Sequence, residues 1–256
     1  MGEFIKSQNT DHILHLGLDR GRSNALHMEM VLELTQELER AKNDPAVEGI
    51  VLHGKEGFFS SGLDLIRLYE YDEKGITEFW NAFMDLVYNL TSFPKPSIAA
   101  VTGHSPAGGC VLAICCDYRV MADGEFIIGL NEVPVGIVVP SSIFSLYSFW
   151  IGQAQAYRNL LEGRLLNPTD AYSCGLIDET VPADRILTAA ARKAKVYAQF
   201  DKTAWATTKL NLRKELLKTL EDSKTIAINQ VLEQWWKPST RQILKTIIGN
   251  LTAKKK

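Results

Sequence analysis

The chain has 256 residues, of which 46% are hydrophobic and 23% charged, with a formal net charge of −2 and an isoelectric point near 6.2. This composition is typical of a globular protein and excludes an intrinsically disordered chain, which combines low hydrophobicity with high net charge. The near-neutral charge also argues against a nucleic-acid partner, whose phosphates require a basic surface.

Strands and helices alternate through the first half of the chain. Short apolar runs predict buried strands, and apolar residues spaced by three and four predict amphipathic helices. The predicted strands are 12–18, 49–53, 97–102, 118–121 and 126–130; the predicted helices are 26–42, with Asn24 as its N-cap, 76–90 and 109–116; 54–64 and 103–109 are predicted as a loop and a turn. Strands separated by helices need crossover connections, so we expect a mostly parallel sheet.

From about residue 141 the pattern becomes helical. Helices are predicted at 154–161, 169–173, 183–200, 203–220 and 226–236. In the fourth of these, Leu212, Leu216 and Leu220 recur every four residues and predict one apolar face. The sequence therefore predicts an α/β fold with a helical C-terminal layer, either as one unit or as a core with a small subdomain.

Cysteine usage and targeting signals indicate the compartment. None of the four cysteines forms a C-x-x-C pair, and no His/Cys spacing matches a metal site, so we expect reduced core cysteines and no metal. No apolar run approaches the 18 or so residues of a membrane span, and the first nine residues carry no secretory or transit signal. A cytoplasmic protein without a membrane partner is expected.

The segment TGHSPAGGC, 102–110, joins a predicted strand to a predicted helix through Gly108 and Gly109. Free amides at a helix start carry the positive end of the helix dipole and can receive an anion or a developing oxyanion. An ordinary tight junction, with glycines chosen for packing, explains the same pattern. A third interpretation is the G-x-S-x-G nucleophile elbow of serine hydrolases, with Ser105 as nucleophile, but Ala107 replaces the second glycine and no histidine follows in the chain.

Two further segments carry polar residues in apolar surroundings. In FFSSGLDL, 58–65, small residues and a glycine precede an acidic residue, Asp64, that can cap the turn that follows. An ordinary glycine-containing loop between a strand and a helix explains the same pattern. In GLNEVPVGIVVP, 129–140, Glu132 is the single carboxylate of an apolar run. An apolar environment raises the pKa of a carboxyl group and suits it to act as a general base, whereas an exposed loop glutamate or a helix cap has no such role.

The three segments, in this order and spacing, resemble the crotonase (enoyl-CoA hydratase/isomerase) superfamily from about residue 12 to the C-terminal helices. The combination of SSGLDL, PAGGC and GLNE is most similar to Δ3,Δ2-enoyl-CoA isomerases. The resemblance implies a crotonase-like ββα spiral core over 1–200 and a helical trimerisation or lid region over 201–256. It also implies a homotrimer or hexamer and an acyl-CoA substrate, with no separate cofactor because CoA arrives as part of that substrate.

The resemblance also assigns roles to individual residues. The amides of Leu63 and Gly108 would hold the thioester oxygen, and Glu132 would be the base. The expected substrate contacts are Ser61, Gly62, Asp64, Leu65, Gly109 and Asn131, with Asn131 also a candidate to orient Glu132. Phe79, Trp80, Phe83 and Met84 are candidates for an acyl tunnel, although a helical apolar stripe is more often plain core. Trp235 and Trp236 are candidates to cover the pocket or to pack on a neighbouring subunit.

The number of carboxylates separates the reactions of this family. Hydratases of the family carry two glutamates, and the first of these positions is Val111 here, whereas the second is Glu132. The implied reaction is the conversion of 3-enoyl-CoA to 2-trans-enoyl-CoA in fatty acid β-oxidation, by transfer of one proton from C2 to C4. The alternatives are a hydratase or hydrolase with a base at Asp64 or Glu70, and a non-catalytic acyl-CoA-binding protein.

Overall fold

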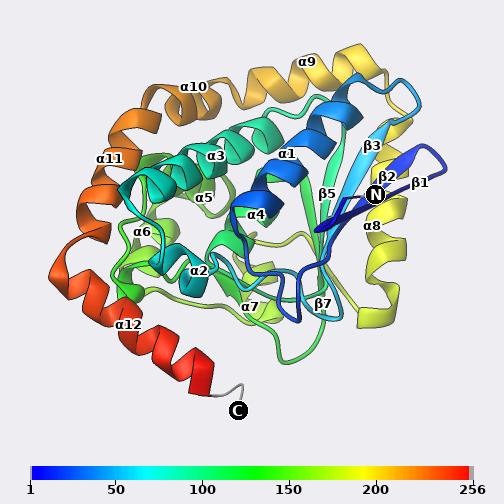
Figure 1. The fold of residues 1–256 in the computed structure, drawn as a ribbon. Helices are drawn as coiled ribbons and strands as arrows, with labels where there is room; N and C mark the ends of the chain where they lie inside the picture. The colour runs from blue at the N-terminus through cyan, green and yellow to red at the C-terminus, as the bar shows by residue number, and fades with distance from the viewer. Residues whose placement is uncertain (1, 254–256) are drawn as a thin grey trace.

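The computed structural model describes residues 2–253, and its strands form two sheets (Figure 1). The strands are β1 (Ile5–Thr10), β2 (Ile13–Leu18), β3 (Gly49–His53), β4 (Gly57–Phe58), β5 (Ser97–Val101), β6 (Gly103–Pro106), β7 (Tyr118–Ala122), β8 (Ile128–Gly129) and β9 (Glu179–Val181). The large sheet has the order β1-β2-β3-β5-β7-β9, and the small sheet has the order β4-β6-β8. Among the paired strands of residues 2–253, β1 and β2 are antiparallel and every other pair is parallel, so the predicted mostly parallel sheet is confirmed.

The helices surround these sheets. They are α1 (Met28–Asn43), α2 (Leu65–Tyr69), α3 (Glu73–Thr91), α4 (Gly108–Cys115), α5 (Ser141–Ile151), α6 (Gln153–Glu162), α7 (Pro168–Ser173), α8 (Ile186–Ala198), α9 (Lys202–Leu212), α10 (Lys214–Asp222), α11 (Lys224–Trp235) and α12 (Pro238–Ala253), with 3-10 turns η1 (Val133–Val135) and η2 (Ala183–Arg185). Within the described residues, no helix is both long and apolar enough to cross a membrane.

The chain advances by a repeated step from the large sheet to the small one. β3 leads to β4, β5 to β6 and β7 to β8, and helices return the chain to the large sheet. This is the predicted ββα spiral. Because successive strand residues face opposite sides of a sheet, the inner strands of the large sheet, β2, β3, β5 and β7, contribute to two cores. In β5, Ala99 and Val101 face the main core, whereas Ile98 and Ala100 face α8.

Helices α9–α12 follow the predicted boundary at residue 200 and run as a band along the outside of the molecule, from the yellow α9 to the red α12 (Figure 1). Buried charges attach this band to the core: Lys209 Nζ lies 2.8 Å from Asp117 Oδ2, and Arg213 Nη2 lies 3.2 Å from Asp117 Oδ1. Arg213 also donates hydrogen bonds to the carbonyls of Thr91 and Cys115. The buried charges are therefore paired, as burial requires. The last three residues of the predicted 201–256 region lie outside the described residues.

Three local predictions are wrong. Asn24 does not cap α1, whose N-cap is His27; Asn24 instead has φ +51° and is fully buried. The predicted turn 103–109 contains β6, which pairs with β4 and β8. The predicted helix 203–220 breaks at Arg213, which turns into the core, so Leu212 is 72% exposed while Leu216 and Leu220 are buried on the next helix.

Several elements were not predicted at all. They are β1, β4, α5, β9 and α12, together with the split between α9 and α10. The turn that Asp64 was expected to cap is the short helix α2, and the Asp64 side chain accepts the amide of Arg67 there. Most of these elements are short or lack a clear apolar period, and their positions depend on contacts with distant segments. The fold class itself follows from the longer, strongly patterned elements.

Candidate active site

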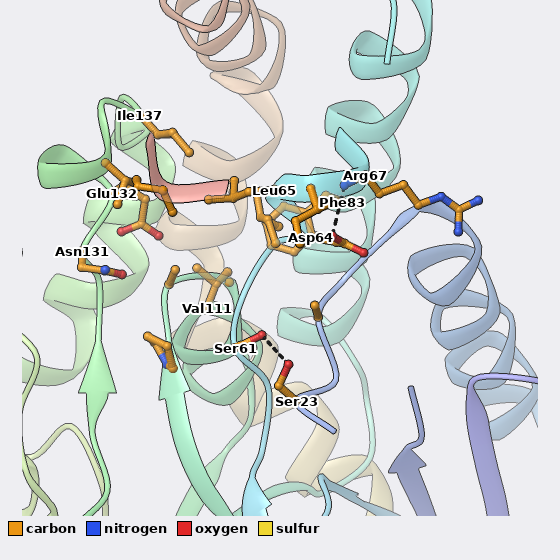
Figure 2. A pocket seen from close by; sticks show the side chains of 18 of the residues that line it. Ser23, Ser61, Asp64, Leu65, Arg67, Phe83, Val111, Asn131, Glu132 and Ile137 are labelled. Atoms are coloured by element: carbon orange, nitrogen blue, oxygen red, sulfur yellow. Dashed lines mark hydrogen bonds between the residues drawn. The ribbon is translucent and has the colours of Figure 1, made fainter. Parts of the chain in front are cut away.

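A cavity of about 950 Å³ opens where the small sheet, α2, α3 and α12 meet. Its walls include residues of the loop after β2, the segment 61–67, the start of α4 and the segment 131–140. Figure 2 shows Glu132 and Asn131 on one side of the cavity, Asp64 and Leu65 on the other, and Val111 and Ser61 between them. Three chain segments that the sequence singled out therefore line a single cavity.

Two backbone amides at this cavity, those of Leu63 and Gly108, have no acceptor within residues 2–253. Leu26 forms an isolated parallel bridge with Leu63, in which Leu26 donates to the carbonyl of Gly62 and accepts from the amide of Asp64, at 2.8 Å each. In such a bridge the N–H of Leu63 points away from its partner strand. Gly108 is the first residue of α4, where amides have no partner within the helix. Within the described chain, neither the Leu63 nor the Gly108 amide donates to another protein group.

Close backbone packing sets the spacing between these two amides. A Cβ atom at Gly109 would lie 2.5 Å from the carbonyl oxygen of Ser60, so only glycine allows α4 to approach the 60–63 segment this closely. Ser60 is fully buried and donates to the carbonyl of Asn24, whose side chain donates to the carbonyl of Phe59. Asn24 therefore supports the amide-bearing segment instead of capping a helix.

The backbone is strained at two residues next to the amide-bearing segments, Ala107 and Asn24. Ala107, which precedes α4, has φ +50°, and Asn24 has φ +51°, conformations that non-glycine residues seldom adopt. Such residues persist only when their surroundings hold them, and they concentrate at functional sites. The amide of Ala107 donates to the carbonyl of Gly129 at 2.8 Å, which joins the start of α4 to the segment that leads to Glu132.

Glu132 stands at the start of the 3-10 turn η1 and points into the cavity (Figure 2). Its Oε2 atom is buried and has no hydrogen-bond partner in residues 2–253. Burial raises the pKa of this carboxyl group to about 7, against a smaller opposing effect of a hydrogen bond with its own backbone. A carboxyl group with such a pKa can both accept and return a proton near neutral pH.

The other candidate acids are not available for catalysis. Asp64 Oδ2 lies 2.5 Å from a guanidinium nitrogen of Arg20, and its Oδ1 accepts the amide of Arg67 at the start of α2. Glu70 is exposed and does not line the cavity. Val111 lines the cavity, but its side chain has no group that can accept or donate a proton. Among the described residues that line the cavity, Glu132 is thus the one acid without a charged partner.

The structure divides the predicted substrate contacts into two groups. Ser61, Asp64, Leu65 and Asn131 line the cavity, together with the three residues predicted to be catalytic. Gly62 and Gly109 do not line it; they shape the backbone behind the amides. The predicted orientation of Glu132 by Asn131 has no support, because no hydrogen bond joins their side chains within the described chain.

Of the apolar residues predicted to line an acyl tunnel or to cover the pocket, some line the cavity and others do not. Trp80 and Phe83 line the cavity, whereas Phe79 and Met84 belong to the surrounding core. Trp235 is buried in that core and Trp236 is 39% exposed, and neither lines the cavity.

The serine-hydrolase interpretation has no support in the structure, because Ser105 is fully buried on β6 and does not face the cavity.

Sequence reasoning missed two parts of the wall. The first is the loop after β2, with Arg20, Arg22 and Ser23, where two arginines around a glycine at the end of a parallel strand were an available signal. The second is α12, which contributes Ile247 and Leu251. Their i, i+4 spacing indicates a helix face but does not reveal where the helix packs.

The cavity thus contains one carboxyl group that can exchange a proton, that of Glu132, and two amides without protein acceptors, those of Leu63 and Gly108. This combination suits acid–base chemistry at a carbon atom next to a carbonyl group. Residues 8–243 match the family model described as Enoyl-CoA hydratase/isomerase. The chain belongs to this family, the crotonases, as the sequence predicted.

Individual relatives agree with this assignment. The chain is 41% identical to enoyl-CoA delta isomerase 1, mitochondrial, of Mus musculus over 64% of this chain and 57% of the relative, so the match spans little more than half of that protein. It is 31% identical to the 2,3-dehydroadipyl-CoA hydratase of Escherichia coli over 83% of this chain and 82% of the relative. The crystal structure of human mitochondrial delta3-delta2-enoyl-CoA isomerase superposes with a TM-score of 0.95, at 27% identity, over 99% of this chain and 100% of that one. The names of these relatives describe enoyl-CoA isomerases and a hydratase of this family.

Proposed function

We propose that the protein is a Δ3,Δ2-enoyl-CoA isomerase. The observation that carries this proposal is the state of the acids in the cavity. Glu132 is half-buried, and its buried Oε2 atom has no hydrogen-bond partner within residues 2–253. Asp64 is held by Arg20, and Val111 stands where hydratases of the family carry a second glutamate. A single acid suffices to move one proton along a chain, whereas hydration calls for two groups, one that activates water and one that completes proton transfer.

The proposed reaction conserves atoms without a cofactor. The Glu132 carboxylate removes a proton from C2 of a 3-enoyl-CoA, and the electron pair spreads over a dienolate whose oxygen accepts hydrogen bonds from the Leu63 and Gly108 amides. The protonated Glu132 then returns the same proton at C4, which leaves the double bond between C2 and C3. Each oxyanion donor typically contributes about 3–4 kcal/mol to such a step.

The charged residues at the cavity support a CoA-linked substrate. Arg20, Arg22 and Arg67 line it, and the latter two are exposed. Arg20 is paired with Asp64 and Arg67 with Glu29, whereas Arg22 has no carboxylate partner among the described residues. Because guanidinium groups bind phosphates through paired hydrogen bonds, the exposed Arg22 suits a phosphate of CoA, while the apolar Trp80 and Phe83 suit an acyl chain. A role in fatty acid β-oxidation, a trimeric or hexameric assembly and a cytoplasmic location belong to the same proposal.

Two substrates test the proposal against its nearest rivals. The purified protein should convert 3-hexenoyl-CoA to the conjugated 2-hexenoyl-CoA, followed by the absorbance of the enoyl thioester. It should hydrate 2-hexenoyl-CoA at about 1% of that rate or less. Faster hydration than isomerisation would make the protein a hydratase, and binding of CoA esters without conversion would make it a binding protein.

The pH dependence of kcat provides an independent test. Because only the carboxylate form of Glu132 accepts a proton and its pKa is about 7, kcat should rise from pH 5.5 and level off above pH 8. The measurement is kcat for 3-hexenoyl-CoA at saturating substrate across this range. A rate that is flat from pH 5.5 to 8.5 would contradict a desolvated base.

Trp80 is expected to limit the length of the acyl chain. It is 4% exposed and lines the cavity, so Trp80→Ala should open space for about two further methylene groups. At about 0.8 kcal/mol for each methylene, the ratio of kcat/KM for 3-dodecenoyl-CoA to that for 3-hexenoyl-CoA should rise about tenfold. Trp236→Ala, which changes an exposed tryptophan outside the cavity, should leave the ratio unchanged. An unchanged ratio in Trp80→Ala would remove Trp80 from the acyl site.

A further inference from the structure

The first turn of α12 is attached to both walls of the cavity. Thr240 Oγ1 donates to the carbonyl of Gly136, just after η1, at 3.1 Å. The neighbouring Arg241 donates to the carbonyl of Tyr69, at the end of α2, at 2.9 Å and stacks 3.5 Å above the Tyr69 ring. Neither Thr240 nor Arg241 lines the cavity. The turn therefore joins the wall that carries Glu132 to the opposite wall without contacting the space for a substrate.

The Thr240 hydroxyl is fixed in direction. Thr240 is 1% exposed, and Gln234 Nε2, near the end of α11, donates to its oxygen at 2.8 Å. Since the oxygen accepts from Gln234, its own proton is free to point to the Gly136 carbonyl. This gives a short chain of hydrogen bonds from α11 through α12 to the η1 turn.

Gly136 is in turn coupled to Glu132. Gly136 ends η1 with φ +78°, and its amide donates to the carbonyl of Val133 at 3.0 Å. The amides of Val135 and Ile137 donate to the carbonyl of Glu132 at 3.1 and 2.9 Å. Because η1 is a single 3-10 turn with Glu132 at its start and Gly136 at its end, a displacement of Gly136 is expected to move Glu132 as well.

We propose that Thr240, held by Gln234, is a positioning residue for the Glu132 carboxylate. The Glu132 side chain makes no hydrogen bond to another residue within the described chain. The orientation of its carboxylate therefore depends on the backbone turn that carries Glu132. Thr240 contacts the turn at Gly136, and Gly163 packs against Pro134 within the turn, where a Cβ atom at Gly163 would lie 2.3 Å from the Pro134 ring. The inference rests on the proposed isomerase function, in which Glu132 must reach both C2 and C4.

Three variants of the full chain test this role. Thr240→Val keeps the volume and removes the hydroxyl, Thr240→Ser keeps the hydroxyl, and Thr246→Val makes the first change at an exposed position of the same helix, where the hydroxyl bonds only within α12. A misplacement of about 1 Å can cost a rate factor of about 10². We expect kcat for 3-hexenoyl-CoA to fall about tenfold in Thr240→Val, with KM within twofold of wild type, and to stay within twofold in the other two variants.

The outcomes distinguish a positioning role from a purely structural one. An unchanged kcat in Thr240→Val, or equal losses in Thr240→Val and Thr246→Val, would overturn the positioning role, as would failure of Thr240→Ser to restore the rate. Circular dichroism checks the fold of each variant. If Thr240→Val does not fold, Gln234→Met tests the same chain of bonds: a threefold lower kcat supports the role and an unchanged kcat overturns it. A wild-type chain that leaves 3-hexenoyl-CoA unconverted overturns the proposed function and the positioning role together.

Discussion

Glu132→Gln is expected to lower kcat for the isomerisation of 3-hexenoyl-CoA by about 10³-fold, with a small change in KM. Gln keeps the size and polarity of the side chain but accepts no proton, and general acid–base groups contribute rate factors of about 10²–10⁴. Because no other unpaired acid lines the described part of the cavity, no second group is available to replace it. The measurement is the initial rate of formation of the conjugated thioester.

A matched control distinguishes this loss from a general effect of removing a carboxylate. Glu70→Gln changes an exposed glutamate outside the cavity and should retain wild-type activity. If Glu132→Gln kept more than a tenth of the wild-type rate, Glu132 would not be the base. If Glu70→Gln were also inactive, a second carboxylate would be required and the single-acid mechanism would be wrong.

The same substitution should raise stability in a pH-dependent way. The pKa of Glu132 is raised from 4.5 to about 7 in the folded chain, so its contribution to stability is fully present below pH 4.5 and is lost as the pH rises through 7. At pH 8 the buried charge costs roughly 3 kcal/mol, which Gln avoids. Glu132→Gln should therefore be more stable than wild type at pH 8, and this advantage should shrink toward pH 5 in urea titrations. A constant difference would indicate an ordinary pKa.

Gly109→Ala is expected to lower kcat/KM about 10²-fold, although Gly109 does not line the cavity. The new Cβ atom would lie 2.5 Å from the backbone oxygen of Ser60, which cannot move aside as a side chain can. The amide-bearing segments of Leu63 and Gly108 must then separate, and loss of one oxyanion donor costs about 10²–10³ in rate. Overpacking of this kind also costs about 1–3 kcal/mol of stability.

Gly249→Ala is the control for this prediction. A Cβ atom at Gly249, on α12, would meet no other group within 4 Å, so activity should not change and stability should rise by up to about 1 kcal/mol. Wild-type kcat/KM in Gly109→Ala would show that the spacing of the two amides does not control the rate. A loss of stability without a loss of rate would lead to the same conclusion.

A site residue could be predicted from the sequence when its own residue type, or that of its neighbours, indicates its role. Glu132 stands out because it is the single carboxylate of an apolar run, and Gly108 because it lies at a predicted helix start, where amides have no partner within the helix. Leu63 has no such signal, since its role belongs to its backbone and any side chain could stand there. It was reached through the resemblance to crotonases.

The sequence alone determined the α/β class and the alternation of long strands and helices, because these follow from apolar periodicity. It determined the family through the resemblance of three segments, in their order and spacing, to crotonases. Only the tertiary structure decided that Asp64 is paired with Arg20, that Asn24 supports the 58–62 segment, and that α12 closes on the cavity. These facts arise from contacts between residues far apart in the chain. Local propensity and spacing carry no information about which distant group a side chain meets.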